Sequence, residues 1–440
     1  MNARPSRKPA DPLIARLRSI DPLQRVGRVV EAYGTLIRVT GISARIGEVC
    51  ELRDPTNECR LSAEVVGIGR GMALLTPLGT LDGISAFTEV ISRGRQATVE
   101  AGDGLLGRVV DALGNVIDGQ AAATGLTPVP LYTDAPNALT RRIIARPFPS
   151  GVRAIDALLT VGEGQRMGVF ASAGGGKSTL LGMLVRGGAA EVNVIILLGE
   201  RGREVREFIE DNLGPDGLRK SVVIVATSDR PALERARAAY VGTAIAEYFR
   251  GRGRRVLLLL DSVTRFARAL RDVGLAVGEP PARRGYPPSV FSAMPRLFER
   301  SGNDAHGSIT AVYTVLLEDE DGDPIGEEVR SILDGHIHLS RKLVAANHFP
   351  AIDVLASASR TMNRVTTRAH QDAAALLRKQ LAKYQEIELL LQIGEYKPGT
   401  DADADLAIRN IKRIRELLRQ PPDRIDDFDG NVRALLELST

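Results

Sequence analysis

The stretch Arg166-Met-Gly-Val-Phe-Ala-Ser-Ala-Gly-Gly-Gly-Lys-Ser-Thr-Leu-Leu181 decides the fold of this chain. Its first apolar residues predict a short buried strand, and the pattern becomes helical from Lys177. Between them, three consecutive glycines lack a Cβ that would block the close approach of a ligand. Strand, glycine loop and helix in this order are the context of a phosphate-binding loop. The full pattern begins with glycine where this chain has Ala171, so a glycine-rich turn before an ordinary helix is the alternative.

The loop predicts how a nucleoside triphosphate would be bound. Backbone N–H groups of such a loop point inward and form an anion nest, and the helix N-terminus adds about half a positive charge at the same place. Lys177 would reach the β- and γ-phosphates, and the Ser178 hydroxyl would ligate Mg²⁺. The loop residues predicted to bind ATP are Ser172, Ala173, Gly174, Gly175, Gly176, Lys177, Ser178 and Thr179.

The composition is that of a globular protein with a full core. The 440 residues are 44% hydrophobic and 25% charged, and the net charge of +4 does not demand a large nucleic-acid footprint. The absence of tryptophan and an aromatic content of 4% weaken any function based on base stacking. Cys50 and Cys59 lack metal-site spacing and are expected to be free thiols in a reducing cytosol. Neither a secretory signal nor an apolar run of ~20 residues is visible, so membrane contact would be peripheral.

The chain is expected to hold three domains after an N-terminal arm. The arm, residues 1–23, either docks on a partner or membrane surface or is not held in place. Short apolar runs separated by Gly, Asn and Pro predict a small oligomerisation β-barrel over residues 24–95. Alternating strand and helix patterns predict an α/β domain with a mainly parallel sheet over residues 96–345. Helical periodicity predicts a C-terminal α-helical domain over residues 346–440.

Carboxylates follow two of the predicted buried strands. Asp261 ends the apolar run 256–260, and Glu200 follows the run 192–198. Parallel strands end at one edge of an open α/β sheet, which is where such sheets bind ligands. Asp261 is therefore expected to hold Mg²⁺ through water, and Glu200 to orient the attacking water. The alternative for Glu200 is a structural ion pair with one of the arginines that follow it.

Phosphoryl transfer also needs positive charge on the γ-phosphate oxygens. An arginine from a neighbouring subunit can raise the rate ~10³–10⁵-fold. Arg201 is a candidate within the subunit, and Arg360, in Ser357-Ala-Ser-Arg360, is a candidate across an interface. His336 and His338 share a predicted strand face, where a zinc pair is the alternative to packing and hydrogen bonding.

Longer stretches of the chain resemble the ATPases of type III protein secretion, which are relatives of the flagellar export ATPase and of the catalytic subunit of rotary ATP synthases. The resemblance extends from about Gln24 to Leu438, and such families tolerate alanine at the position of Ala171. The stretches that carry it are Gly199-Glu-Arg-Gly-Arg-Glu-Val-Arg-Glu-Phe-Ile209, Asp261-Ser-Val-Thr-Arg-Phe-Ala-Arg268, Gly278-Glu-Pro-Pro-Ala-Arg-Arg-Gly-Tyr-Pro-Pro-Ser-Val290, Ser331-Ile-Leu-Asp-Gly-His336 and Ile393-Gly-Glu-Tyr396.

The resemblance implies a RecA-like P-loop NTPase core that uses ATP and Mg²⁺. By this similarity Arg201 would lie near the γ-phosphate, and Arg360 would be the arginine finger supplied in trans. The catalytic residues that it implies are Lys177, Glu200, Arg201 and Arg360, with Ser178 and Asp261 as the Mg²⁺ residues.

The resemblance also implies partners and a location. A homohexamer would form with the barrel as its collar, and the loop from Arg283 to Tyr286 would face a coiled-coil central stalk. A stator or regulator protein and chaperone–effector complexes are further expected partners, the latter at the C-terminal domain. The protein would be cytoplasmic, associated peripherally with the export apparatus at the cytoplasmic face of the inner membrane, and would not bind nucleic acid.

One departure from the family pattern concerns the base of the nucleotide. Catalytic subunits of rotary synthases clamp adenine between aromatic side chains, whereas the apparent counterparts here, around Gln371 and Pro422, are not aromatic. Gln371 is still expected at the nucleotide. Selectivity for adenine is in doubt, and we expect GTP to be tolerated.

Three other functions remain open on the sequence. The flagellar version of the same machine is the nearest, although Gly162-Glu-Gly-Gln-Arg-Met167 is closer to the injectisome branch. A ring helicase or translocase on RNA would need a basic, aromatic face in the barrel, where residues 24–90 offer only Tyr33 and Phe87. A non-catalytic ring subunit would not be expected to keep Glu200.

Overall fold

The computed structural model describes residues 26–439 apart from 58, 70, 173 and 318–321. The predicted N-terminal arm, residues 1–23, and Ala173 of the phosphate loop lie outside the described residues. The chain divides into two compact units that meet in sequence between Gln96 and Ala97. No helix within the described ranges is long and apolar enough to cross a membrane.

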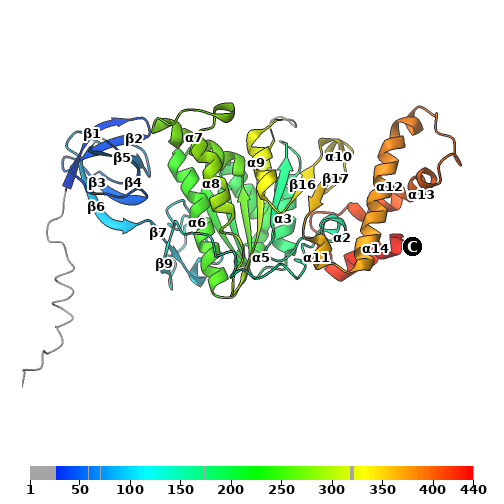
Figure 1. Ribbon diagram of the computed structural model, residues 1–440. Coiled ribbons are helices and arrows are strands. Elements are labelled where there is room, and N and C mark those ends of the chain that lie inside the picture. Colours follow the sequence, from blue (N-terminus) through cyan, green and yellow to red (C-terminus); the bar gives the residue numbers. More distant parts are fainter. Residues whose placement is uncertain (1–25, 58, 70, 173, 318–321, 440) are drawn as a thin grey trace, which may run out of the picture. The chain divides into compact units, whose positions relative to one another are not determined.

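The first unit is a closed antiparallel barrel, blue to cyan in Figure 1, and confirms the barrel predicted from the sequence. Its strands neighbour one another in the order β1-β2-β5-β4-β3-β6. Side chains alternate between the two faces, so that Ile37 and Val39 fill the core and Arg38 faces outward. The strands are β1 (Val26–Tyr33), β2 (Leu36–Thr40), β3 (Glu48–Arg53), β4 (Arg60–Gly69), β5 (Met72–Pro77) and β6 (Glu89–Gln96).

A nine-stranded sheet forms the centre of the second unit, in the order β17-β16-β10-β15-β13-β11-β12-β8, with β14 paired to β15. Neighbouring strands are parallel except in the β16–β17 and β14–β15 pairs. This confirms the predicted α/β domain with a mainly parallel sheet. The strands are β8 (Val109–Val110), β10 (Arg166–Ala171), β11 (Val192–Leu198), β12 (Ser221–Ala226), β13 (Arg255–Asp261), β14 (Gly302–Asn303), β15 (Ser308–Leu316), β16 (Gly335–Leu339) and β17 (Ile352–Ser359).

Helices cover both faces of this sheet, which explains why its strands are continuous apolar runs. On one face, α3 (Lys177–Gly187) shares a hydrophobic core with Ile195 and Leu197 of β11. On the other face, α6 (Ala232–Gly251) approaches so closely that a Cβ on Gly242 would lie 2.4 Å from Ile196. The helices can be followed in green in Figure 1.

The C-terminal helices share the core of the sheet domain. Leu377 of α12 (Arg368–Gln392) and Leu435 of α14 (Phe428–Ser439) are buried in the same cluster as α2 (Arg153–Leu158) and α3. The predicted helical character of this region is confirmed. The predicted boundary at residue 346 is too early, because β17 still belongs to the sheet through its pairing with β16.

The remaining elements connect these layers. After β8 the chain turns back on itself: Val110 bridges Val116 in antiparallel fashion, and the Ile117 N–H donates to the Val109 carbonyl at 2.9 Å. The other elements are β7 (Thr98–Ala101), η1 (Asp103–Leu105), β9 (Thr127–Pro130), α4 (Gly202–Glu207), η2 (Phe208–Leu213), α5 (Gly214–Arg219), α7 (Val263–Ala276), η3 (Arg283–Gly285), α8 (Pro288–Phe298), α9 (Pro324–Ile332), α10 (Arg341–Ala345), α11 (Met362–Val365) and α13 (Ala402–Leu418).

Candidate functional site

The phosphate loop has the backbone that the sequence predicts. It joins the end of β10 at Ala171 to the start of α3 at Lys177. Gly174 and Gly176 have φ values of 76° and 78°, which L side chains rarely adopt, so glycine is needed at both positions. The turn is closed by a hydrogen bond from the Gly175 N–H to the Ser172 carbonyl at 3.1 Å. The first N–H groups of α3, which have no partner within the helix, directly follow this turn.

Lys177 lies between two carboxylates. Its Nζ is 2.5 Å from Asp261 Oδ1 and 3.4 Å from Glu200 Oε1. Burial alone would lower the pKa of Lys177, but the facing Asp261 and Glu200 carboxylates outweigh it and hold the pKa above its ordinary value. Lys177 therefore stays protonated at any working pH and can exchange these carboxylates for phosphate oxygens of the same sign.

Asp261 is fixed by the strand that ends in it. β13 lies between β11 and β15, so that the Asp261 side chain meets Thr314 of β15, whose hydroxyl donates to Asp261 Oδ1 at 2.8 Å. In register it is opposite Leu197, three residues before Glu200. The predicted meeting of Lys177, Glu200 and Asp261 at one sheet edge is thus what the strand order produces.

Glu200 lies in a partly buried, highly charged environment. Burial raises the pKa of its carboxyl and the nearby Asp261 adds to this, while Lys177 opposes it. Arg265 Nη2 donates to Glu200 Oε2 at 3.2 Å, and the same guanidinium also donates to the Gly199 carbonyl. Glu200 is therefore held by arginine as well as lysine, and its carboxyl faces the space in front of the loop.

Sequence reasoning missed Arg265, although the stretch Asp261–Arg268 was recognised. Its signal is its position on the first turn of α7, just after the strand that delivers Asp261. The Arg265 Nε is buried without a hydrogen-bond partner among the described residues. A buried unpaired donor next to Glu200 fits an anionic ligand, because leaving it unpaired costs free energy.

A cavity of about 130 Å³ opens in front of this cluster. It is acidic, and both Ser178 and Asp261 line it. Hydroxyl, carboxylate and water oxygens are the ligands that Mg²⁺ takes when it is bound together with phosphates, so these residues fit the ion. The residues lining the cavity are Ser178, Leu197, Glu200, Glu204, Val205, Glu207, Phe208, Asn212 and Asp261.

Two further residues lie against the loop. Arg341 Nε of α10 donates to the Ser172 hydroxyl at 2.7 Å. The Phe349 ring lies 3.7 Å from the place where a Cβ on Gly176 would be, so an aromatic face borders the phosphate loop. Sequence reasoning looked for aromatics near Gln371 and Pro422 and missed Phe349, which lies in the connection between β16 and β17.

The remaining predicted residues fall into two groups. Thr179 lies in the first turn of α3, and no hydrogen bond of its side chain is found in the described part of the chain. The Arg201 side chain is 80% exposed and pairs with Glu204 at 3.7 Å, so it lies outside the cavity. Its predicted place near the γ-phosphate therefore requires a different side-chain conformation.

Arg360 and Gln371 lie at the opposite end of the sheet domain. Arg360 follows β17 next to the start of β16, whereas the phosphate loop follows the far end of the parallel strand β10. The Gln371 amide donates to the Asn363 and Thr366 carbonyls at 3.0 Å, in the same region as Arg360. The Gln371 amide is therefore bonded away from the phosphate loop of its own chain, and its contact with the nucleotide stays a prediction.

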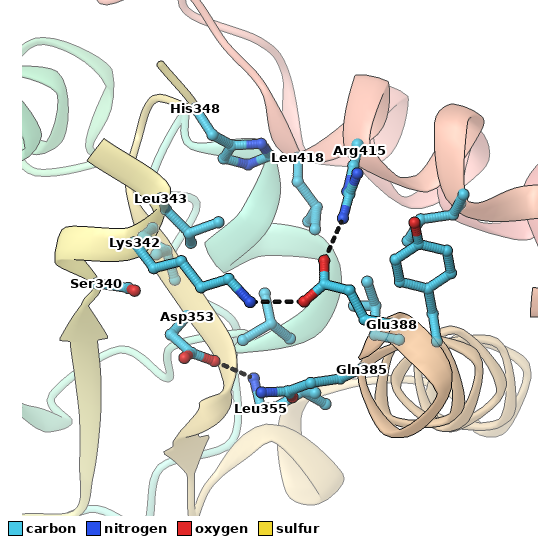
Figure 2. A pocket seen from close by; sticks show the side chains of 15 residues that line it. Ser340, Lys342, Leu343, His348, Asp353, Leu355, Gln385, Glu388, Arg415 and Leu418 are labelled. Atoms are coloured by element: carbon cyan, nitrogen blue, oxygen red, sulfur yellow. Dashed lines mark hydrogen bonds and ion pairs between the residues drawn. The ribbon is translucent and has the colours of Figure 1, made fainter. Parts of the chain in front are cut away.

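A second cavity, of about 150 Å³, lies between the sheet edge and the C-terminal helices (Figure 2). Glu388 of α12 crosses it to meet Lys342 Nζ of α10 at 2.6 Å and Arg415 Nη2 of α13 at 3.5 Å. Burial, with Arg419 and Arg415 nearby, lowers the pKa of His348 on its wall to about 4. The cavity carries no constellation for phosphoryl transfer, and its predominantly apolar lining suits a packing joint between elements.

Three family models match the chain. The nucleotide-binding domain of the ATP synthase alpha/beta family matches residues 151–359. The beta-barrel domain of the same family matches residues 29–94. The model called T3SS EscN ATPase C-terminal domain matches residues 366–437.

The chain is also similar to other proteins along nearly its whole length. A type 3 secretion system ATPase of Xanthomonas euvesicatoria is 57% identical over 417 residues, covering 94% of each chain. A flagellum-specific ATP synthase of Bacillus subtilis (strain 168) is 46% identical over 429 residues, covering 97% of this chain and 98% of its own. The assembled ATPase EscN of the enteropathogenic E. coli type III secretion system superimposes with a TM-score of 0.89 at 47% identity, covering 94% of this chain and 100% of that one.

Proposed function

The chain belongs to the type 3 secretion ATPases of the ATP synthase alpha/beta family, and from this we propose that it is a homohexameric, Mg²⁺-dependent ATPase with sites shared between subunits that energises type III protein export. The observation that supports a shared site is that the phosphate loop and Arg360 of one chain lie far apart. The phosphate loop with Lys177, here called the cradle, and Arg360 lie at opposite ends of the neighbouring strands β10 and β16. A head-to-tail ring brings such ends together at each subunit interface.

The residues around the cradle divide the chemistry between them. Lys177 and the loop N–H groups bind the phosphates, and Lys177 leaves Asp261 and Glu200 for the phosphate oxygens. Ser178 and Asp261 would hold Mg²⁺, which neutralises phosphate charge when bound. Glu200, steadied by Arg265, accepts a hydrogen bond from the attacking water and directs it in line with the bond to be broken.

Arg360 of the neighbouring subunit completes the site in this proposal. Its guanidinium stabilises charge on the γ-phosphate oxygens as that charge develops, a contribution worth ~10³–10⁵ in rate in other phosphoryl-transfer enzymes. Its side chain is exposed, and it makes no ion pair with any residue that the structure describes. It is therefore available to a partner.

Phe349 supports a base-binding role next to the loop. An aromatic ring stacks on any base, because every base presents a π-face. We therefore infer that the nucleotide base packs on Phe349 with little discrimination, which agrees with the expectation that GTP is tolerated.

The partners of the assembled ring follow from the family. One solved structure of EscN contains its central stalk EscO, and this chain matches it with a TM-score of 0.88. We propose that the loop at η3 meets such a coiled-coil stalk. In this chain Arg283 is anchored to Glu327 and Glu328 of α9 at 3.3 and 3.5 Å. A stator protein, chaperone–effector complexes at the C-terminal helices, and peripheral association with the export apparatus at the cytoplasmic face of the inner membrane complete the proposal.

Ring formation and activity can be measured together. Mass photometry and ATP turnover are followed over a range of protein concentration with Mg²⁺ present. Specific activity should rise in step with the fraction of rings, since a lone subunit lacks the neighbour's arginine. Turnover per chain that stays constant from monomer to ring would contradict a shared site.

A further inference from the structure

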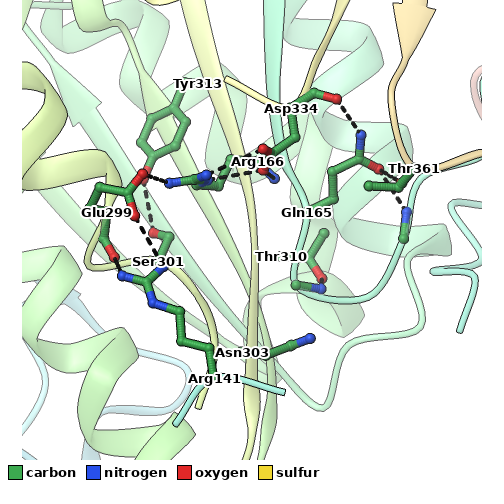
Figure 3. Close-up of polar contacts among 12 residues, drawn as sticks. Arg141, Gln165, Arg166, Glu299, Ser301, Asn303, Thr310, Tyr313, Asp334 and Thr361 are labelled. Carbon is green, nitrogen blue, oxygen red and sulfur yellow. Dashed lines mark hydrogen bonds and ion pairs between the residues drawn. The ribbon is translucent and has the colours of Figure 1, made fainter. Parts of the chain in front are cut away.

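Gln165 is a buried residue at the start of β10 to which the reaction described above gives no role. Its side chain is fully buried, and both ends of its carboxamide are used (Figure 3). Oε1 accepts from the Gly162 N–H at 2.8 Å and from the Thr361 hydroxyl at 2.5 Å. Nε2 donates to the Asp334 carbonyl at 2.9 Å and to the Ser359 hydroxyl at 3.1 Å. These four contacts satisfy most of what a carboxamide can bond.

The contacts of Gln165 bracket Arg360. Ser359 and Thr361 are the residues on either side of it, and the Arg360 N–H donates at 3.0 Å to the same Asp334 carbonyl that Gln165 binds. The side chains on either side of Arg360 are thus bonded to one buried carboxamide, and the Arg360 N–H is bonded to the carbonyl that this carboxamide also binds. Its guanidinium remains exposed.

The residue next to Gln165 holds the side chain of the same aspartate. Arg166 binds the Asp334 carboxylate through Nε at 3.0 Å and Nη2 at 3.2 Å, and it also pairs with Glu299. Burial opposes the charge of Arg166, but Asp334 and Glu299 outweigh it and raise its pKa. Asp334 is therefore a rigid support for Arg360.

We propose that Gln165 is a positioning residue that holds Arg360 in the orientation needed to reach the γ-phosphate bound by the neighbouring subunit. The proposal rests on the shared site proposed above. Its physical basis is that a displacement of about 1 Å of a reacting or stabilising group costs ~10²-fold in rate. Gln165 therefore acts on the nucleotide site of the neighbouring subunit. It does so although it precedes β10, the strand that leads into the phosphate loop of its own chain.

The first experiment replaces Gln165 with methionine, which keeps the volume and removes all four hydrogen bonds. The Gln165→Met ring should lose ~10²-fold in kcat, with KM, the ADP affinity of each cradle and the fraction of rings unchanged. Gln380→Met is the matched control, since Gln380 is also buried but bonds Asn410 between α12 and α13. An equal loss in the control would overturn the proposal.

The second experiment tests on which chain Gln165 acts. Gln165→Met subunits are mixed with Glu200→Gln subunits, which retain Arg360 but cannot direct water. In a 1:1 mixture about one junction in four joins an intact cradle to an intact arginine, so up to about a quarter of wild-type turnover should return. Arg360→Ala mixed with Glu200→Gln is run in parallel.

The two mixtures separate this inference from the proposed function. Recovery in both supports it. Recovery with Arg360→Ala but not with Gln165→Met overturns the role of Gln165 and leaves the shared site standing. If neither mixture recovers, the shared site itself is wrong. Thr361→Val, which removes only one of the four contacts, should show the same trans recovery from a smaller loss, and it serves as the test if Gln165→Met does not fold.

Discussion

At the scale of single residues, the site is a small set of charges whose balance depends on one lysine. Glu200→Gln should lower kcat ~10²–10⁴-fold while leaving nucleotide affinity nearly unchanged, because the amide still occupies the space but no longer attracts the water proton. Turnover and binding of a fluorescent nucleotide provide the measurement. Glu207→Gln is the control and should keep wild-type turnover, because Glu207 also lines the cavity but pairs with the exposed Arg203 rather than with Lys177 or Arg265.

The pH profile adds a second check on Glu200. Its pKa is raised by burial, so the carboxyl is ionised only above the range usual for glutamate. Turnover should therefore fall on the acid side at a pH above about 4.3, the ordinary pKa of glutamate. This acid limb should disappear in Glu200→Gln; a limb that persists there would assign the titration to another group.

Phe349 makes a prediction about the base. Phe349→Leu should raise KM for ATP and GTP by similar factors of ~10, since stacking is worth about 1–3 kcal/mol and is insensitive to the base. In the wild-type protein GTPase activity should be a sizeable fraction of ATPase activity. Strict dependence on ATP in parallel turnover assays would count against both statements.

Local motifs are enough to propose Lys177, Ser178, Glu200 and Asp261 from the sequence, because each is defined by its neighbours in the chain. Arg265, Phe349 and Gln165 cannot be proposed in this way, because what singles them out is contact with residues distant in the sequence. Gln371 is the opposite case. Family position suggested the nucleotide, but its amide is bonded to the Asn363 and Thr366 carbonyls.

At the scale of elements, the joint between α2 and α14 carries a buried carboxyl. Burial raises the pKa of Asp156 to about 6, although Ser150 and Asn431 donate hydrogen bonds to it. Because the pKa of Asp156 is higher in the folded than in the unfolded state, the contribution of this one group to stability is largest below pH ~4. That contribution is lost as the pH rises through 6. The rise corresponds to roughly 3 kcal/mol at neutral pH.

Asp156→Asn should remove that dependence. The amide stays neutral, and the Asn431 amide can rotate to present its oxygen to it. Urea unfolding between pH 4 and pH 8 should then show a smaller fall in stability with pH for the variant than for the wild type. Parallel curves for the two proteins would show that Asp156 titrates in the folded state as it does in the unfolded chain.

The elements themselves were largely predictable, since apolar runs and helical periodicity are local signals. The edge strand β17 was not, because an eight-residue strand with alternating burial at the sheet edge resembles a loop until its partner β16 is known. The apolar faces of the C-terminal helices likewise predict that the helices are packed, but not that they pack against the sheet domain rather than against one another. Sequence therefore locates the elements better than the boundaries between domains.

At the scale of the whole molecule, the two compact units should respond differently to nucleotide. All the residues of the cradle belong to the unit after Gln96. At about 100 times its Kd, Mg·ADP should stabilise that unit by about 2.7 kcal/mol through mass action. In dilute, monomeric protein, hydrogen exchange should slow in peptides around β10, β11 and β13 and remain unchanged in the barrel.

Lys177→Ala supplies the control for this measurement. The variant should lose the protection at every Mg·ADP concentration that protects the wild type, because the cradle no longer holds the phosphates. Protection that spreads into the barrel of the monomer would mean that the two units do not respond independently.

The placement of cradle and arginine at opposite ends of adjoining strands has a genetic consequence. In the shared site proposed above, each chain serves two junctions, one with its loop and one with Arg360, so a copy that is defective in both inactivates two of them. An allele of this kind would be dominant over the normal gene whenever both are expressed, and export would decline more steeply than the dose of the faulty copy.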